Sequence, residues 1–309
     1  MAGDGRGEPV LSVVLPTYDS AHTLDAAARS VLTGNTVALE LIVIDDGSTD
    51  DTAAVLAELT TDPRVRVISR PNRGLAASLN EGIAAARAPF IARMDADDVS
   101  APGRFDAQVE FMAAHPDVVL AGGQIRRVIN GVAESSSRFP LDHDTIVAAL
   151  LRGQHAVCHP AVVMRRSALD RVGGYWDEGV AEDWDLFLRL SEVGELANLD
   201  RHVLDYSFHG GGINASSMVA VRTNIGLAVR NHYRRTCGLD TLNVRRYRED
   251  LTVPKRMKIR AESLSLGLYR RSMQAGTSSK TAKTVLLAGA ALSWPPFAVR
   301  RIRETAHAS

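Results

Sequence analysis

Apolar runs and stretches of helical periodicity alternate over the first hundred residues. Short, continuous apolar runs occupy residues 10–15, 39–44, 65–68 and 90–94, and such runs are typical of strands buried on both faces. Apolar residues at helical spacing lie between them, at residues 24–32, 52–59 and 75–87. Strands that alternate with helices over short connections predict a mostly parallel sheet covered by helices on both faces. We therefore expect an α/β fold.

The pattern is more mixed after residue 100. It predicts helices at residues 102–115 and 182–193, and strands at residues 118–121, 124–129, 161–164 and 203–208. Asn130-Gly131 is typical of a hairpin turn. From Met218 onward the pattern is helical. These patterns divide the chain into a disordered N-terminus (1–9), an α/β domain (10–217) and a basic helical C-terminal region (218–309).

Composition fits this division. The chain has 309 residues, of which 45% are hydrophobic, and this is enough for one large α/β domain with an appendage. The Gly-rich, polar N-terminus has no apolar segment of the kind found in secretory signals. Cys158 and Cys237 lie far apart in the sequence, which argues against a disulfide scaffold. Both observations favour a cytoplasmic location.

The net charge of zero hides an uneven distribution. Residues 241–309 hold 14 of the 36 basic residues and 4 of the 36 acidic ones, so this region carries +10 and the rest of the chain −10. A basic region of this kind suggests an anionic surface as partner. We expect peripheral contact with the inner face of a membrane and no nucleic acid. The alternative is a helical face that only water covers.

An apolar segment near the C-terminus bears on the membrane question. Residues 284–299 are largely apolar but contain Pro295 and Pro296. A spanning helix needs about 20 apolar residues, and this segment is shorter and interrupted. An interfacial segment fits it better, with arginines at its edge, and a buried packing helix is the alternative.

Polar clusters follow each of the first four predicted strands, at Thr17–Asp19, Asp45–Ser48, Asn72–Gly74 and Asp95–Asp98. Ligands of parallel α/β sheets bind at the carboxyl ends of the strands. We therefore expect these clusters to line one ligand site.

Three carboxylates close together form the richest of these clusters. Asp95, Asp97 and Asp98 come directly after a buried strand, where unpaired charge is costly. Carboxylate oxygens suit Mg²⁺ or Mn²⁺, and a bound metal would neutralise a diphosphate leaving group. The alternative is a helix cap formed by Asp97 or Asp98.

The remaining candidates each have a structural alternative. Asp46 can bond a base or ribose, or form a turn. Arg73 can pair with phosphate, or lie in a surface turn. Asp183 can deprotonate a hydroxyl, although acidic residues also favour a helix N-terminus. His209 precedes three glycines and can ligate a metal, although a lone histidine is more often structural.

Taken together, the motifs resemble those of the family 2 glycosyltransferases, which have the GT-A fold. They occur in the family's order over about residues 10–215. The matching stretches are Ser12–Tyr18, Ile42–Asp50, Asn72–Leu75, Met94–Asp98, His159-Pro160 with Gly173–Tyr175, Ala181–Asp185 and His209–Gly211. The resemblance implies a mixed, mostly parallel sheet flanked by helices, with a helical C-terminal extension.

The resemblance also implies a role for each residue. Pro16 and Thr17 match nucleotide contacts, Asp46 the aspartate that recognises the base, and Arg73 the loop facing the nucleotide. Asp95 matches a residue near the ribose, Asp97 the principal metal ligand and Asp183 the catalytic base. His209 matches a late histidine that completes the metal site. The mechanism implied is direct displacement with inversion, from a UDP- or dTDP-type sugar donor and with Mg²⁺ or Mn²⁺ as cofactor.

Two departures from the family pattern refine the expectation. Asp19 stands where the family often has Asn. The Gln-x-x-Arg-Trp motif of processive synthases is absent from the sequence, as is any multi-span membrane region. We therefore expect transfer of a single sugar to a carbohydrate, lipid-linked or small-molecule acceptor, in cell-surface polysaccharide or glycoconjugate biosynthesis.

Other classes of protein fit the sequence less well. A dinucleotide-dependent dehydrogenase needs a Gly-rich turn after the first strand, where this chain has Pro16–Asp19. A metal-dependent phosphatase would need further groups that we cannot assemble. A non-catalytic nucleotide-sugar-binding protein and a tailoring glycosyltransferase that acts on a small molecule remain as alternatives.

Overall fold

The structure is a computed structural model that describes residues 8–129, 131–177, 179–208, 218–275 and 280–294. The chain forms two compact units. Unit 1 extends to residue 177 and includes residues 182–208, while unit 2 comprises the short segment 178–181 and the chain from residue 209 onward. The disorder expected for residues 1–9 falls almost wholly outside the described residues.

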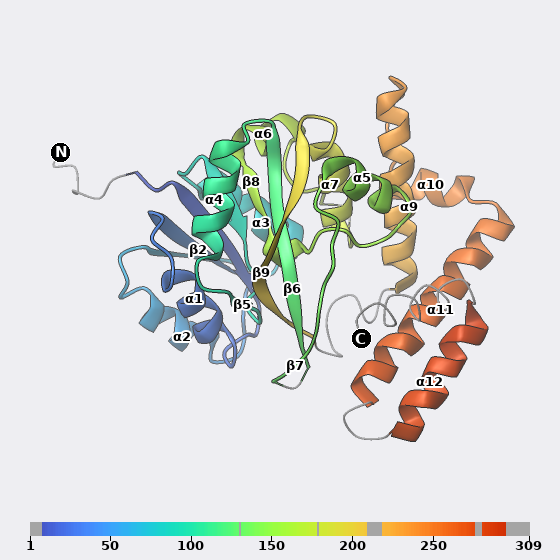
Figure 1. The fold of residues 1–309 in the computed structure, drawn as a ribbon, viewed down its shortest axis with the longest axis horizontal. Helices are drawn as coiled ribbons and strands as arrows, with labels where there is room; N and C mark the ends of the chain where they lie inside the picture. Colours follow the sequence, from blue (N-terminus) through green and yellow to red (C-terminus); the bar gives the residue numbers. More distant parts are fainter. Residues whose placement is uncertain (1–7, 130, 178, 209–217, 276–279, 295–309) are drawn as a thin grey trace. The chain divides into compact units, whose positions relative to one another are not determined.

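Unit 1 begins with alternating strands and helices, as the apolar pattern predicts (Figure 1). The strands are β1 (Leu11–Thr17), β2 (Leu39–Asp45), β3 (Val65–Ser69) and β4 (Phe90–Arg93). The helices between them are α1 (Leu24–Leu32), α2 (Thr52–Leu59) and α3 (Leu75–Ala85). These four strands pair in parallel in the order β3-β2-β1-β4. Their carboxyl ends therefore lie at one edge of the sheet.

The second half of unit 1 extends the sheet with mixed directions. The order continues from β4 as β8-β6-β9-β5, with β7 paired to β6. The strands are β5 (Val99–Ser100), β6 (Val118–Ile129), β7 (Val132–Ser136), β8 (Val163–Arg165) and β9 (Glu195–Ser207). The helices are α4 (Arg104–Ala114), α5 (His143–Leu151), α6 (Arg166–Val172) and α7 (Glu182–Leu190), with a 3-10 turn at His159–Ala161.

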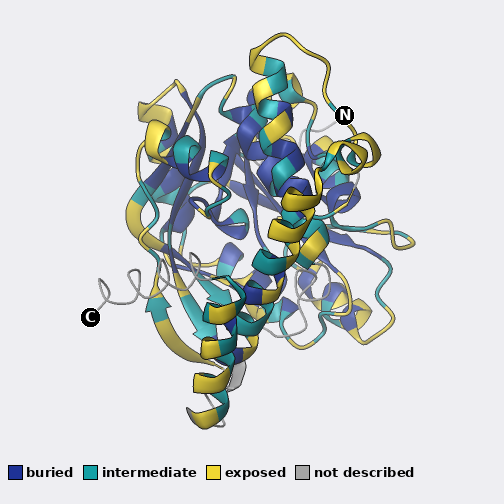
Figure 2. Cartoon of the chain, turned by 90° about the vertical axis from the view of Figure 1, so that its right-hand side faces the viewer, coloured by how far each residue is buried: buried dark blue, intermediate teal, exposed yellow. Residues whose placement is uncertain are grey.

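Helices cover both faces of the sheet because the strands are apolar on both sides. Leu11, Val13 and Leu15 of β1 belong to a buried core with residues of α1 and α4. Val14 faces the other way, toward α3, where a Cβ atom on Gly82 would lie 2.3 Å from its Cγ1. Figure 2 shows the central strands as buried and the outward faces of the surrounding helices as exposed. The predicted α/β architecture is confirmed.

Several element boundaries differ from those predicted. The two strands expected at residues 118–121 and 124–129 form the single long strand β6, because Gly122 and Gly123 continue the pairing with β9. The strand expected at residues 203–208 begins earlier, at Glu195. β6 and β7 do form an antiparallel pair, but Asn130 of the expected turn lies outside the described residues.

The described part of unit 2 is mainly helical. Its helices are α9 (Met218–Thr236), α10 (Val244–Asp250), α11 (Val253–Ala275) and α12 (Lys280–Ser293). The apolar segment expected at the membrane lies partly in α12, which packs along α11, and Ser265 Oγ donates a hydrogen bond to the Ala290 carbonyl. Leu292 on the same helix is 84% exposed. Across the described residues, no helix is both long enough and apolar enough to cross a membrane.

Candidate active site

The loops after β1 and β2 are bound to each other by hydrogen bonds. Asp19 accepts a bond from the Thr49 backbone N–H, and its own N–H donates to Ser48 Oγ at 3.0 Å. Asp19 has a positive φ of 47°, a conformation that Asn and Asp adopt more readily than other side chains. Asp19 therefore suits a position at which the family often has Asn.

Asp46, the predicted base-recognition residue, lies between the loops after β2 and β3. Its Oδ1 accepts from the Arg73 N–H and its Oδ2 from the Gly74 N–H, both at 2.8 Å. Arg70 also forms an ion pair with the Asp46 carboxylate. Asp46 is buried, and Oδ2 accepts no second bond among the described residues. Because each carboxylate oxygen has two lone pairs, Oδ2 can accept one more hydrogen bond.

The close approach of these two loops depends on Gly47. Its φ is +81°, and a Cβ atom there would lie 2.8 Å from the Asn72 backbone nitrogen. Any other residue would separate the loops and weaken the bonds of Asp46. Arg73, in contrast, contributes its backbone to this arrangement, and its side chain is exposed. The Arg73 side chain, which is predicted to contact phosphate, therefore faces solvent in this structure.

Buried oxygen atoms without partners lie at the end of β1 and in the loop after β4. Among the described residues, Thr17 Oγ1 and Asp98 Oδ2 are buried and have no hydrogen-bond partner. Thr17 follows Pro16 at the end of β1, where the family resemblance implies a nucleotide contact. An unsatisfied buried oxygen costs about 1–3 kcal/mol, so both atoms are suited to a bound ligand.

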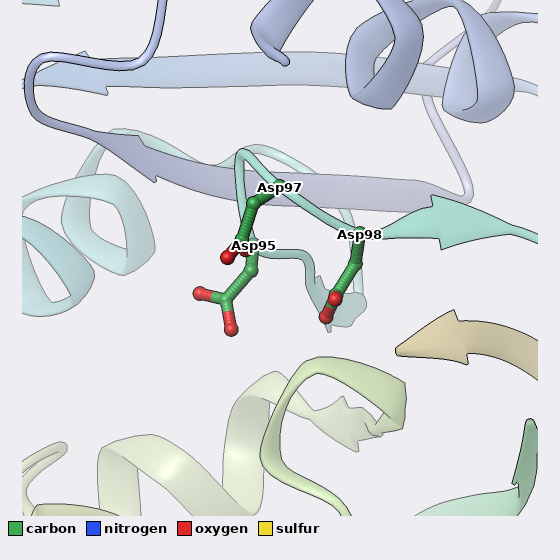
Figure 3. A group of neighbouring side chains, drawn as sticks. All are labelled: Asp95, Asp97 and Asp98. Atoms are coloured by element: carbon green, nitrogen blue, oxygen red, sulfur yellow. The ribbon is translucent and has the colours of Figure 1, made fainter. Parts of the chain in front are cut away.

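Asp95, Asp97 and Asp98 converge in the loop after β4 (Figure 3). One carboxylate oxygen from each lies within 4.8 Å of those of the other two. Oxygen ligands at about 2.1 Å from one octahedral ion are themselves about 3–4 Å apart, so the spacing of the three side chains is close to that needed to hold a single divalent cation. Burial, with Asp95 and Asp97 nearby, raises the pKa of Asp98 well above its usual range. A cation at this position would relieve that repulsion.

Arg93 is the buried cation of the site. It is the last residue of β4 and is 3% exposed, and its Nη1 lies 2.5 Å from Asp95 Oδ2. Burial alone would lower the pKa of Arg93, but Asp95, Tyr175 and Asp98 together raise it above its ordinary value. The Arg93 guanidinium therefore remains charged.

Two carboxylates begin α7. Burial and the neighbouring Asp183 raise the pKa of Glu182 to about 7. Burial also raises the pKa of Asp183, although the Trp184 N–H and Arg93 partly offset this effect. Asp183 accepts from the Trp184 N–H at 2.8 Å. Ala181, directly before the pair, has a φ of +66°, which is strained for a residue with a side chain. A carboxylate with a raised pKa is a stronger base near neutral pH.

A neutral hydrogen-bonded pair supports these carboxylates. His159 Nε2 lies 2.8 Å from the Tyr175 hydroxyl, and His159 Nδ1 lies 3.8 Å from Glu182 Oε1. Burial and Arg93 hold the pKa of His159 well below its ordinary value, so the imidazole is neutral. Asn80 of α3 fixes the backbone of Tyr175 through two hydrogen bonds, of 2.7 and 2.8 Å.

The structure thus brings most of the predicted residues to one edge of the sheet. Asp46 and Thr17 lie at the ends of adjacent strands. Arg93 forms an ion pair with Asp95 and is also close enough to Asp183 to lower its pKa. His209 lies outside the described residues. The sequence interpretation did not include Arg93 or Glu182 among the residues of this candidate site. A charged residue at the end of an apolar strand was the available signal for Arg93.

We expect Arg93→Met to lower the free energy of unfolding by about 3–5 kcal/mol, because it leaves buried carboxylates without their cation. Arg29→Met is the matched control, since Arg29 is exposed and pairs with Asp25 on the surface of α1. The control should leave the free energy of unfolding almost unchanged, because an exposed ion pair contributes little to stability. Urea unfolding of both variants measures the difference, and equal losses would contradict the role of Arg93.

Comparison with known sequences identifies relatives. The profile described as Glycosyl transferase family 2 matches residues 12–173, which is more than half of the chain. The amylovoran biosynthesis glycosyltransferase AmsE of Erwinia amylovora is 29% identical over 195 residues, which cover 62% of this chain and 73% of AmsE. The chain spans 66% of the length of an uncharacterized glycosyltransferase of Haemophilus influenzae and 22% of the length of the hyaluronan synthase of Pasteurella multocida.

Solved structures share the fold. The structure of S. aureus TarS in complex with UDP-GlcNAc has a TM-score of 0.59 at 16% identity, and the match covers 92% of this chain and 87% of that chain. The mannosyltransferase PcManGT from Pyrobaculum calidifontis, in complex with GDP-Man and Mn²⁺, has a TM-score of 0.55 at 18% identity, with coverage of 94% and 82%. At these identities the likeness is one of fold, and it confirms the predicted GT-A architecture.

Proposed function

The chain belongs to glycosyl transferase family 2, and we propose that it moves a single sugar from a UDP- or dTDP-type donor to an acceptor hydroxyl with inversion. The observation that carries this proposal is the arrangement around Arg93. This buried cation pairs with Asp95 of the carboxylate cluster and influences the pKa of Asp183 on α7. A cluster that can hold a metal and a carboxylate that can act as a base thus share one neighbourhood.

In the proposed reaction, Asp183 removes the proton of the acceptor hydroxyl. The acceptor oxygen bonds to the anomeric carbon as the bond to the nucleoside diphosphate breaks, so one displacement inverts the configuration. Asp97 is the principal residue that would hold Mg²⁺ or Mn²⁺, with Asp95 directed to the ribose and His209 completing the site. When bound, the metal neutralises charge on the departing diphosphate.

The nucleotide contacts follow from the loops at the strand ends. Asp46 keeps one acceptor position on Oδ2, which suits the imide N–H of uracil or thymine. Thr17 Oγ1 is buried and without a partner in the described part of the chain, and Pro16 and Arg73 border the same loops. TarS with UDP-GlcNAc and PcManGT with GDP-Man and Mn²⁺ support a nucleotide-sugar donor and a divalent metal.

A donor screen tests the proposal. The full-length protein is mixed with UDP-, dTDP- and GDP-sugars and with Mn²⁺ or Mg²⁺, and both thermal protection and release of the nucleoside diphosphate are measured. A matching donor at about 100 times its Kd stabilises the fold by about 2.7 kcal/mol. We expect protection by uracil or thymine nucleotides. Protection by GDP-sugars alone would contradict the role of Asp46, and no protection by any donor would contradict the function.

The acceptor and the location extend the proposal. We place the activity in cell-surface polysaccharide or glycoconjugate biosynthesis at the cytoplasmic face of the membrane. The match to AmsE, an amylovoran biosynthesis glycosyltransferase, supports the biosynthetic role. The +10 charge of residues 241–309 and the exposed Val253 and Met257 of α11 support peripheral contact with anionic lipid. Cosedimentation with anionic vesicles measures that contact. A protein that does not sediment with the vesicles would contradict the proposed membrane contact.

A further inference from the structure

A cavity of about 780 Å³ lies within unit 2, between α9, α10 and α11. Its walls are fixed to one another. The Asn231 amide bonds both the carbonyl and the N–H of Leu242, the residue just before the cap of α10. A Cβ atom on Gly226 of α9 would lie 2.5 Å from the Tyr247 hydroxyl, so α10 packs tightly on α9. The volume is within the range of about 300–1,000 Å³ typical of ligand pockets.

Most of the charged side chains that line this cavity, which we name the arginine pocket, are arginines. The lining includes four arginines and a single carboxylate, that of Glu249. Glu249 pairs with Arg245 at 3.2 Å. The other three arginines, Arg248, Arg256 and Arg260, form no ion pair that the structure records among its described residues. Their positive charges therefore gather in one concave surface, which concentrates anions there.

Arg248 on α10 and Arg256 and Arg260 on α11 line the same pocket. Arg256 Nη2 donates to the Arg248 carbonyl at 3.1 Å, and this bond holds the start of α11 against the end of α10. Arg260 lies one helical turn beyond Arg256. Guanidinium groups bind phosphate oxygens through paired hydrogen bonds. Val219 and Ile259 provide apolar contacts in the same cavity.

We propose that the arginine pocket binds a phosphate or diphosphate group of an anionic ligand, and that Arg248, Arg256 and Arg260 pair with its oxygens. This site is separate from the donor site, because all its lining residues belong to unit 2. The phosphate is carried either by a lipid headgroup or by a free phosphorylated molecule. Val253 and Met257 on α11 are exposed apolar side chains that could contact lipid. The test therefore has a separate arm for a lipid headgroup.

The test compares two double variants of the full chain with the same change in charge. Arg248→Gln with Arg260→Gln removes two arginines of the pocket. Arg246→Gln with Arg271→Gln removes two exposed arginines from the same two helices but outside the pocket. All four side chains are exposed, so both variants should fold, which circular dichroism verifies. Inorganic pyrophosphate is titrated by calorimetry in EDTA, which removes the divalent metal that the donor site requires.

We expect the wild type and the control variant to bind pyrophosphate alike and the pocket variant to bind at least about tenfold more weakly. Vesicles of phosphatidylcholine with phosphatidic acid form the second arm. If the pocket variant alone loses sedimentation with these vesicles, and pyrophosphate releases the wild type, the phosphate belongs to a lipid. If the wild type binds pyrophosphate but does not sediment with the vesicles, the ligand of the pocket is a free phosphorylated molecule. Equal losses in both variants, or no binding by the wild type in either arm, would overturn the proposal.

Discussion

Replacing Asp183 with Asn should lower the rate of sugar transfer by about 10²- to 10⁴-fold, the usual contribution of a general base. Asn is nearly the same shape as Asp but cannot take up the acceptor proton. The Trp184 N–H can still donate to the Asn oxygen as it does to Asp183, so the start of α7 should keep its structure. Binding of the donor nucleotide should therefore remain, and calorimetry with UDP or dTDP measures it separately from turnover.

Glu182 is the necessary comparison for this variant. Its pKa is raised to about 7 by burial and by Asp183, so its carboxylate is also a base of suitable strength. If Glu182→Gln abolishes transfer and Asp183→Asn does not, the base is Glu182. If neither variant loses activity, the base is neither of these two carboxylates. Asp170→Asn, an exposed change on α6, serves as the control and should leave the rate unchanged.

The pH profile gives a second readout of the same base. Both pKa values are raised, so the carboxylate pair holds a proton at a pH where an exposed pair would be fully ionised. If Asp183 is the base, kcat/KM should decline as the pH falls through its raised pKa, and if Glu182 is the base the decline should begin near pH 7. A rate with no decline on the acid side, down to the pH at which an exposed carboxylate is protonated, would contradict assignment of the base to this pair.

The second large effect is expected for Asp97→Asn, with a loss of about 10²- to 10³-fold in transfer. A metal that neutralises a leaving group supplies several kcal/mol, and each 1.36 kcal/mol is a factor of ten in rate. The cluster around Asp97 has oxygens within 4.8 Å of one another, so loss of one charged ligand should also raise the Mn²⁺ concentration needed for half-maximal activity.

Metal removal provides the matched measurement for Asp97. EDTA should abolish transfer by the wild type, and added Mn²⁺ or Mg²⁺ should restore it. Asp117→Asn is the control, because Asp117 is exposed just before β6 and lies outside the cluster. Full activity of the wild type in EDTA would contradict the metal assignment, and an Asp97→Asn variant with an unchanged Mn²⁺ requirement would remove Asp97 from the ligand set.

The sequence by itself predicted the parallel half of the sheet and the loops that follow its strands. Apolar periodicity is local information, and β1, β2 and β4 are buried on both faces, so their apolar runs are continuous. The loop residues follow from the strand ends, since parallel strands place their carboxyl ends at one edge. The family resemblance then supplied roles for Asp46, Asp97 and Asp183, which remain proposals.

Only the tertiary structure decided which charged groups lie close enough to interact. Arg93 pairs with Asp95 and also affects the pKa of Asp183, a residue 90 positions later that no local pattern relates to it. The pairing of β6 with β9 was likewise decided by long-range contacts rather than by the pattern of either strand. The raised pKa values at the start of α7 follow from burial, because loss of solvent disfavours the charged form. Sequence determines which residues can do chemistry, and the packing around them sets their charge.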